Sequence, residues 1–99
     1  MERPVTIVTG AGSGIGRATA VLLAERGHAL TLVGRTEGKL HETAALCGAA
    51  GAAAIVLACD LADRDAAHEA VDRTIAERGH LDTLVGCAGS APQIGRAHV

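Results

Sequence analysis

The chain has 99 residues, of which 48% are hydrophobic, and its formal net charge is −2. This composition predicts one small folded domain with a modest core and argues against a disordered chain. The chain has no block of like charge and no apolar run of about 20 residues. These absences argue against a nucleic-acid-binding surface and a membrane span. The first residues, MERPVTIVTG, lack a signal-peptide pattern, so we expect a cytoplasmic protein.

The first half of the chain alternates between strand-like and helix-like segments. Residues 4–9 form a β-branched run that predicts a buried strand, and residues 14–26 show helical periodicity. One face of this helix is expected to carry four residues: Ile15, Thr19, Leu22 and Leu23. Gly27 is a typical helix stop, and residues 28–34 predict the second strand.

The second half repeats this alternation. Residues 37–50 predict a helix that ends before Gly51, and residues 52–59 predict the third strand. The apolar stripe of that helix is expected to contain three residues: Leu40, Ala44 and Cys47.

A third helix is predicted over residues 64–78, with Asp63 as its N-cap and Gly79 as its stop. One stripe of this helix is expected to contain four residues: Ala67, Val71, Thr74 and Arg78. Residues 81–86 predict the fourth strand, and residues 90–99 are predicted to be a coil tail.

Four strands with a helix after each of the first three give the order βαβαβαβ. Strands joined by crossover helices are expected to be parallel, with right-handed connections. Their continuous apolar runs, such as VTIV and AIVLA, are typical of strands that are buried on both faces. We therefore predict an α/β, Rossmann-like fold in three layers, with strand order 3-2-1-4 and truncation after strand 4. A crevice is expected at the carboxyl ends of strands 1 and 4.

A glycine-rich segment, TGAGSGIG at residues 9–16, joins the first strand to the first helix. The N-terminus of a helix has unpaired N–H groups and partial positive charge, and small residues let a phosphate approach them. Gly10 is expected to turn the chain out of the strand, and Gly16 to allow close packing of helix on strand. The spacing is G-x-x-x-G-x-G rather than G-x-G-x-x-G, but its strand–loop–helix context predicts dinucleotide binding. The pyrophosphate site is expected to contain six residues: Gly10, Gly12, Ser13, Gly14, Ile15 and Gly16.

The end of the second strand indicates which dinucleotide binds. An acidic residue there would bind both ribose hydroxyls and repel a 2′-phosphate, but this chain has Gly34 followed by Arg35. A guanidinium binds phosphate strongly, so we predict NADP(H) rather than NAD(H), with Thr36 adding a hydroxyl. The alternative for Arg35 is an ordinary solvated charge. Arg17 is a weaker candidate and is expected to be exposed on the first helix turn.

The segment TGAGSGIG resembles the T-G-x-x-x-G-I-G motif of the classical short-chain dehydrogenases/reductases. LTLVGR, LACDLAD and LDTLVGCAG are similar to further segments of that family, so the resemblance extends over residues 4–89. It implies that Asp60 and Leu61 face the adenine, with Asp60 binding its amine. It also implies that Ala88 and Gly89 line the nicotinamide-side ribose, and that residues 1–99 form a partial NAD(P)-binding Rossmann domain.

The chain departs from the family pattern in two places. Gly86 and Cys87 stand where the family usually has two asparagines, which implies looser geometry on the nicotinamide side. The family's catalytic Tyr-x-x-x-Lys lies beyond the fourth strand, whereas this chain has no Tyr and its only lysine is Lys39. We therefore expect no catalytic residue here, no family-type oligomer interface and no activity of the chain alone.

The resemblance thus implies the NADP(H)-binding portion of an oxidoreductase, which transfers hydride between the nicotinamide and an alcohol or carbonyl substrate. Two other interpretations stay open. One is a stand-alone, non-catalytic NADP(H)-binding module. The other is a fragment of an S-adenosylmethionine-binding methyltransferase, which the sequence Gly34-Arg35 disfavours because that class usually has an acid at this place.

The remaining chemistry-bearing residues predict no further site. The three cysteines, Cys47, Cys59 and Cys87, are odd in number and widely spaced, which predicts buried free thiols in a cytosolic chain. The five histidines include no i, i+4 pair, and none has zinc-ligand spacing to a cysteine. We therefore predict no metal site.

Overall fold

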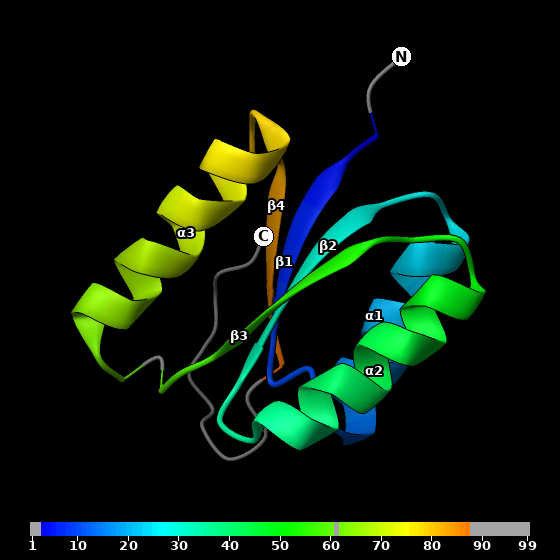
Figure 1. The fold of residues 1–99 in the computed structure, drawn as a ribbon, viewed down its shortest axis with the longest axis horizontal. Coiled ribbons are helices and arrows are strands. Elements are labelled where there is room, and N and C mark those ends of the chain that lie inside the picture. The colour runs from blue at the N-terminus through cyan, green and yellow to red at the C-terminus, as the bar shows by residue number, and fades with distance from the viewer. Residues whose placement is uncertain (1–2, 61, 88–99) are drawn as a thin grey trace.

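A computed structural model describes residues 3–60 and 62–87, which form a four-stranded sheet between two layers of helices (Figure 1). The strands are β1 (Val5–Thr9), β2 (Ala29–Gly34), β3 (Ala54–Ala58) and β4 (Thr83–Gly86). The helices are α1 (Gly14–Glu25), α2 (Glu37–Ala49) and α3 (Arg64–Arg78). All seven predicted elements are present in the predicted order. The predicted coil at 90–99 lies outside the described residues.

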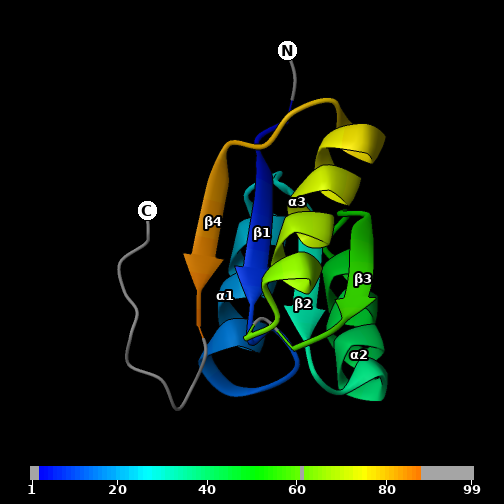
Figure 2. The same cartoon turned by 90° about the vertical axis from the view of Figure 1, so that its left-hand side faces the viewer.

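The strand order is β3-β2-β1-β4 and every neighbouring pair is parallel, as predicted. β1 lies in the middle, with Thr6 opposite Leu30 of β2 on one side and Thr83 of β4 on the other. The arrowheads of all four strands point to the same edge of the sheet (Figure 2). The loops that follow the strands therefore gather at this edge, which we call the carboxyl edge.

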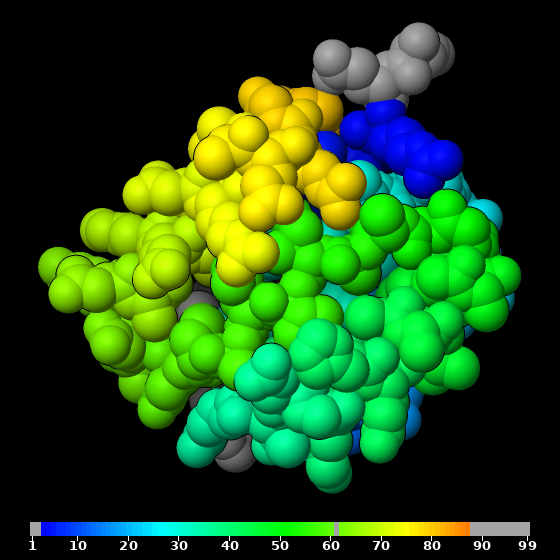
Figure 3. Space-filling view, in the orientation of Figure 1, coloured from blue at the N-terminus to red at the C-terminus, as the bar shows by residue number. Residues whose placement is uncertain are grey.

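Two apolar clusters hold the helices to the sheet. Val8, Leu30 and Leu32 pack with α1 and α2 on one face, whereas Ile7 and Val33 pack with α3 on the other. Successive strand residues point to opposite faces, so the run Ile7–Val8 supplies both clusters. This explains why β1 is buried along its whole length. Around the outside, α3 and α2 lie to either side of the edge strand β3 (Figure 3).

The face by which α1 packs was predicted wrongly. Ile15 is 77% exposed and Leu22 is 49% exposed, whereas Gly16, Ala20 and Ala24 are buried. These three small residues follow an i, i+4, i+8 pattern and let the helix backbone approach the sheet closely. Of the predicted residues, Leu23 is half-buried and packs against the core, whereas Ile15 and Leu22 lie outside this close contact.

The other two helices follow their predicted patterns more closely. In α2, Leu40 and Cys47 are buried as predicted, but Thr43 is buried in place of the half-buried Ala44. α3 begins at the predicted cap, where the carboxylate of Asp63 accepts a hydrogen bond from the backbone N–H of Asp65. It ends at Gly79, whose φ of 91° is the left-handed conformation typical of a helix stop.

Candidate functional site

The loop between β1 and α1 turns at two glycines with left-handed backbone. Gly10 has a φ of 64° and Gly14 a φ of 58°, a conformation that costs glycine little and other residues much more. Gly10 turns the chain out of β1, as expected. The next residue, Ala11, donates its N–H to the carbonyl of Val33 at 3.1 Å, which fixes the loop to the end of β2.

Close packing explains two further glycines of this loop. A Cβ at Gly16 would overlap the carbonyl of Gly10, so the first turn of α1 can lie on the loop only without a side chain there. A Cβ at Gly12 would lie 3.1 Å from the Cβ of Lys39, at the start of α2. The glycines thus draw the loop, α1 and α2 together at the carboxyl edge.

The N-terminus of α1 retains its positive character. Ser13 is the N-cap residue, but its hydroxyl forms no capping hydrogen bond, and no acidic residue lies in the first turn. Ser13 and Gly14 are exposed, and so is Ile15. The backbone N–H groups of this turn and the Ser13 hydroxyl are therefore accessible to an anion.

The ends of β2 and β3 lie beside the glycine loop. The N–H of Cys59 donates to the carbonyl of Gly34 at 2.8 Å, and a Cβ at Gly34 would lie 3.9 Å from the N of Ala11. Arg35, directly after β2, is exposed and forms no hydrogen bond or ion pair with residues 3–60 and 62–87. The predicted residues at the ends of strands 1 and 2 are thus brought together.

Two other predicted site residues lie at this edge. Thr36 is the exposed N-cap of α2, and its hydroxyl makes no capping hydrogen bond. Asp60 is exposed after β3, and one of its carboxylate oxygens accepts the N–H of Ala62 at 2.9 Å. The second oxygen of Asp60 forms no hydrogen bond within the described part of the chain. Three predicted residues lie outside the described residues: Leu61, Ala88 and Gly89.

Arg17 was expected to be exposed on the first turn of α1, but it is half-buried and hydrogen-bonded. Its Nη2 donates to the carbonyl of Gly12 at 2.7 Å and to the carboxylate of Glu42 at 3.1 Å. Its Nε donates to the hydroxyl of Thr43 at 2.9 Å, and that hydroxyl donates to the buried carbonyl of Ala11 at 2.8 Å. Arg17 and Thr43 therefore hold the carbonyls of the glycine loop against α2. Residues that lie 26 positions apart carry no periodic signal that could have predicted this pairing.

The end of β4 is fixed to β1 through Thr9. The N–H of Cys87 donates to the Thr9 hydroxyl at 3.2 Å, and that hydroxyl donates to the carbonyl of Val85 at 3.4 Å. The Thr9 hydroxyl thus supplies the side-chain hydrogen bonds that join the end of β4 to β1. The described residues end at Cys87 on this side, so the looser nicotinamide-side geometry stays a prediction.

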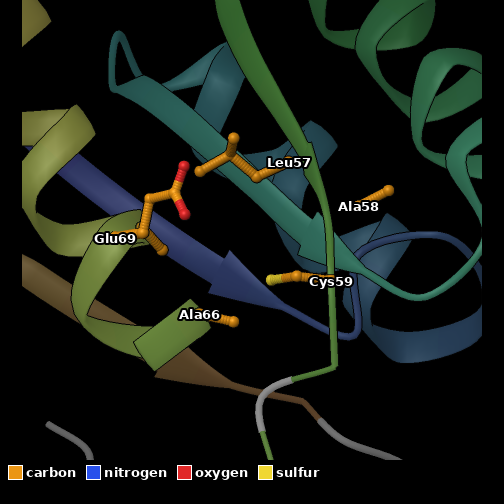
Figure 4. A pocket seen from close by; sticks show the side chains of 6 residues that line it. Leu57, Ala58, Cys59, Ala66 and Glu69 are labelled. Atoms are coloured by element: carbon orange, nitrogen blue, oxygen red, sulfur yellow. The ribbon is translucent and has the colours of Figure 1, made fainter. Parts of the chain in front are cut away.

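A small cavity of about 80 Å³ lies between β3 and α3. Leu57 and Cys59 point from the β3 side toward Ala66 and Glu69 of α3 (Figure 4). Pockets for small organic ligands have volumes of roughly 300–1,000 Å³, so this cavity is too small for a nucleotide.

The three cysteines are free, as predicted, but only Cys47 is fully buried, and Cys59 and Cys87 are half-buried. Burial raises the pKa of Cys47, and burial followed by the charges of Glu69 and Asp60 raises the pKa of Cys59. Both thiols therefore stay protonated near neutral pH and are poor nucleophiles.

Within residues 3–60 and 62–87, no helix is both long and apolar enough to cross a bilayer. The same residues bring together no group of three His, Cys, Asp or Glu side chains that could hold a metal ion.

Comparison with known proteins agrees with this geometry. The family model for short chain dehydrogenases matches residues 4–98. The chain belongs to this family. It is 44% identical over 88 residues to the short-chain reductase protein NovJ of Streptomyces niveus, and this alignment covers 89% of the chain and 34% of NovJ. It is 46% identical over 87 residues to the cis-4-hydroxycyclohexanecarboxylate dehydrogenase of Sinomonas cyclohexanicum, which covers 88% of the chain and 34% of that enzyme.

Solved structures of this family have the same fold as the chain. A short-chain dehydrogenase/reductase from Sinorhizobium meliloti 1021 superposes with a TM-score of 0.84 at 36% identity, over 93% of this chain and 42% of that one. The apo form of glucose dehydrogenase from Caenorhabditis elegans gives 0.83 at 36% identity, over 91% and 39%. The chain spans about a third of the length of the curated relatives described above. The family and the fold predicted from the sequence are both confirmed.

Proposed function

We propose that this short-chain dehydrogenase chain forms the NADP(H)-binding portion of a cytoplasmic oxidoreductase. The reaction is hydride transfer between the nicotinamide and an alcohol or carbonyl group of a small-molecule substrate. The observation that carries the proposal is the glycine loop, which places the accessible N-terminus of α1 at the carboxyl edge of a parallel sheet. This position and this chemistry suit a pyrophosphate.

The residues present fit the parts of the dinucleotide. The Ser13 hydroxyl and the backbone N–H groups after Gly12 would bind the pyrophosphate. Gly12 leaves room for the pyrophosphate to reach them, because a side chain at this position would contact Lys39. Asp60 has one carboxylate oxygen that can accept a hydrogen bond from the adenine amine. We also propose the adenine-side role of Leu61 and the ribose-side roles of two further residues: Ala88 and Gly89. The bound nicotinamide would supply or accept the hydride.

The end of β2 supports NADP(H) over NAD(H). Gly34 offers no carboxylate to repel a 2′-phosphate, and a side chain there would lie 3.1 Å from the Cδ2 of Leu40. Arg35 is exposed, and its guanidinium has no partner within the described residues. We therefore propose that Arg35, assisted by the hydroxyl of Thr36, binds the 2′-phosphate.

We propose no turnover by these 99 residues alone, because none of them is the tyrosine that resemblance to the family implies as the proton donor. We propose neither a nucleic acid nor a membrane as a partner.

Replacing Arg35 with Asp tests the proposal. The chain has no Trp or Tyr, so the fluorescence of bound NADPH can be followed without protein emission. The variant should bind NADPH about 10–100-fold more weakly, the worth of a charge-assisted hydrogen bond, while binding of NADH is unchanged or improved. Arg26→Asp is the matched control, because Arg26 is exposed at the opposite end of α1. Equal losses for both cofactors would remove Arg35 from the site, and no binding of either by the unmodified chain would refute the function.

A further inference from the structure

A second exposed cation, Lys39, lies beside the glycine loop in the first turn of α2. Its Cβ would be 3.1 Å from a Cβ at Gly12, so its side chain starts at the loop itself. The carbonyl of Lys39 accepts hydrogen bonds from Arg17 Nη2 and from the Thr43 hydroxyl, both at 3.2 Å. The backbone of Lys39 is therefore fixed against the loop, whereas its side chain is exposed.

The three basic residues near the loop differ in what they already bind. Arg17 is committed to the carbonyl of Gly12, to Thr43 and to Glu42. Arg35 and Lys39 form no side-chain hydrogen bond or ion pair with the described residues. Only these two have a charge available for a ligand.

The neighbouring acids are also accounted for. Glu42 pairs with Arg17 at 3.1 Å, and Glu37 pairs with His41 at 3.3 Å on one side of α2. Residues two apart on a helix do not face each other, so Glu37 does not lie alongside Lys39. Glu42 lies three residues after Lys39 on the same face but is bound to Arg17, so the Lys39 ammonium forms no ion pair with the described residues.

We propose that Lys39 is a second cation of the 2′-phosphate subsite and determines cofactor specificity together with Arg35. This inference rests on the proposed function, because it concerns the same NADP(H) site. Arg35 would bind the phosphate from the end of β2 and Lys39 from the start of α2, on the side of Gly12. A lysine suits this second position, because its ammonium is a point charge on a flexible four-carbon stem. NADH lacks the 2′-phosphate, so the Lys39 ammonium would not strengthen its binding.

Two variants and two small probes test this inference in the full chain. Adenosine 2′,5′-bisphosphate and AMP contain the adenosine half alone and differ by the 2′-phosphate. Lys39→Gln should weaken binding of the bisphosphate and of NADPH by about tenfold, and leave AMP and NADH within about twofold. Lys39→Arg should keep most of the NADPH affinity, and Arg26→Gln should change none of these affinities. Equal weakening of AMP and the bisphosphate by Lys39→Gln would overturn the inference, because it would indicate a merely structural role.

Chemical labelling supplies a measurement that needs no variant. Lys39 is the only lysine of the chain, so acylation mapped by peptide mass spectrometry reports on this side chain alone. Saturating NADPH should protect Lys39 from acylation, and saturating NADH should not. Suppose that the chain prefers NADPH and that Arg35→Gln removes this preference. Equal labelling of Lys39 with both cofactors would then overturn this inference and leave the proposed function intact. A chain that binds neither cofactor would refute the proposed function itself.

Discussion

Gly16 and Gly48 both lie within helices, but an added methyl group would meet different surroundings. At Gly16 it would overlap the carbonyl of Gly10, and at Gly48 it would meet nothing within 4 Å. Gly16→Ala should lower the free energy of unfolding by at least about 1–3 kcal/mol, because the first turn of α1 must move away from the loop. Urea denaturation followed by circular dichroism measures this change.

Gly48→Ala is the matched control for that substitution. It should raise the free energy of unfolding by about 0.5–1 kcal/mol, because alanine has less backbone freedom to lose in an exposed helix. Equal effects at both positions would contradict the close contact between Gly16 and the loop.

The thiol of Cys47 makes stability depend on pH in the alkaline range. Burial raises the pKa of Cys47 in the folded chain above its ordinary value of 9.0. Above that pH the unfolded chain releases a proton that the folded chain keeps. The free energy of unfolding should therefore fall as pH rises, until the folded thiol also ionises. Denaturation between pH 7 and about pH 10.5 should show a smaller alkaline loss for Cys47→Ala than for the unmodified chain, and parallel curves would contradict this role.

At the scale of single residues, the sequence predicted conformations better than long-range partners. Gly10, Gly79 and Asp63 were identified correctly because turns and caps depend on a few neighbouring residues. The contacts of Arg17 with α2 were missed, because they join residues whose proximity exists only after the sheet and helices have assembled.

Among the elements, the attachment of α2 to the glycine loop depends on one buried hydroxyl. Thr43 donates to the carbonyl of Ala11, which is buried. Thr43→Val should lower the free energy of unfolding by about 1–3 kcal/mol, because it leaves a buried carbonyl without a donor. The same substitution should also weaken NADPH and NADH binding to similar extents, since the loop serves both. Denaturation and cofactor titration measure the two effects.

Thr83→Val is the matched control, because Thr83 is a half-buried strand residue whose side chain has no hydrogen-bond partner within the described part of the chain. Its effect on unfolding should stay within about 0.5 kcal/mol. If Thr43→Val were equally mild, the hydroxyl would not be what holds the loop to α2.

The identity of each element followed from the sequence, but the packing of α1 did not. Periodicity counts large apolar residues, and it therefore favoured the face of Ile15 and Leu22. The true contact face consists of Gly16, Ala20 and Ala24, because close approach to the sheet requires small side chains. Small residues give no hydrophobic signal of comparable strength.

At the scale of the whole molecule, topology could be predicted because few arrangements satisfy its constraints. Alternating strands and helices favour parallel pairing with right-handed crossovers, and the doubly wound sheets built in this way commonly have the order 3-2-1-4 that is observed. The structure places the predicted cofactor-binding residues only where they follow described strand ends, because three of them lie outside the described residues.

The same topology predicts how stability is distributed through the sheet. β1 has a strand on each side and is buried throughout, and β2 is buried except at Gly34. β3 and β4 each pair with one described strand and are only partly buried. Amides of β1 and β2 should therefore exchange hydrogen most slowly, by about tenfold for each ~1.4 kcal/mol of difference in opening free energy. Hydrogen exchange measured by NMR resolves these amides. We expect β4 to open separately, because it is partly buried and pairs with one described strand. Protection of the β4 amides equal to that of the β1 amides would contradict this, because it would show that β4 opens only with the whole sheet.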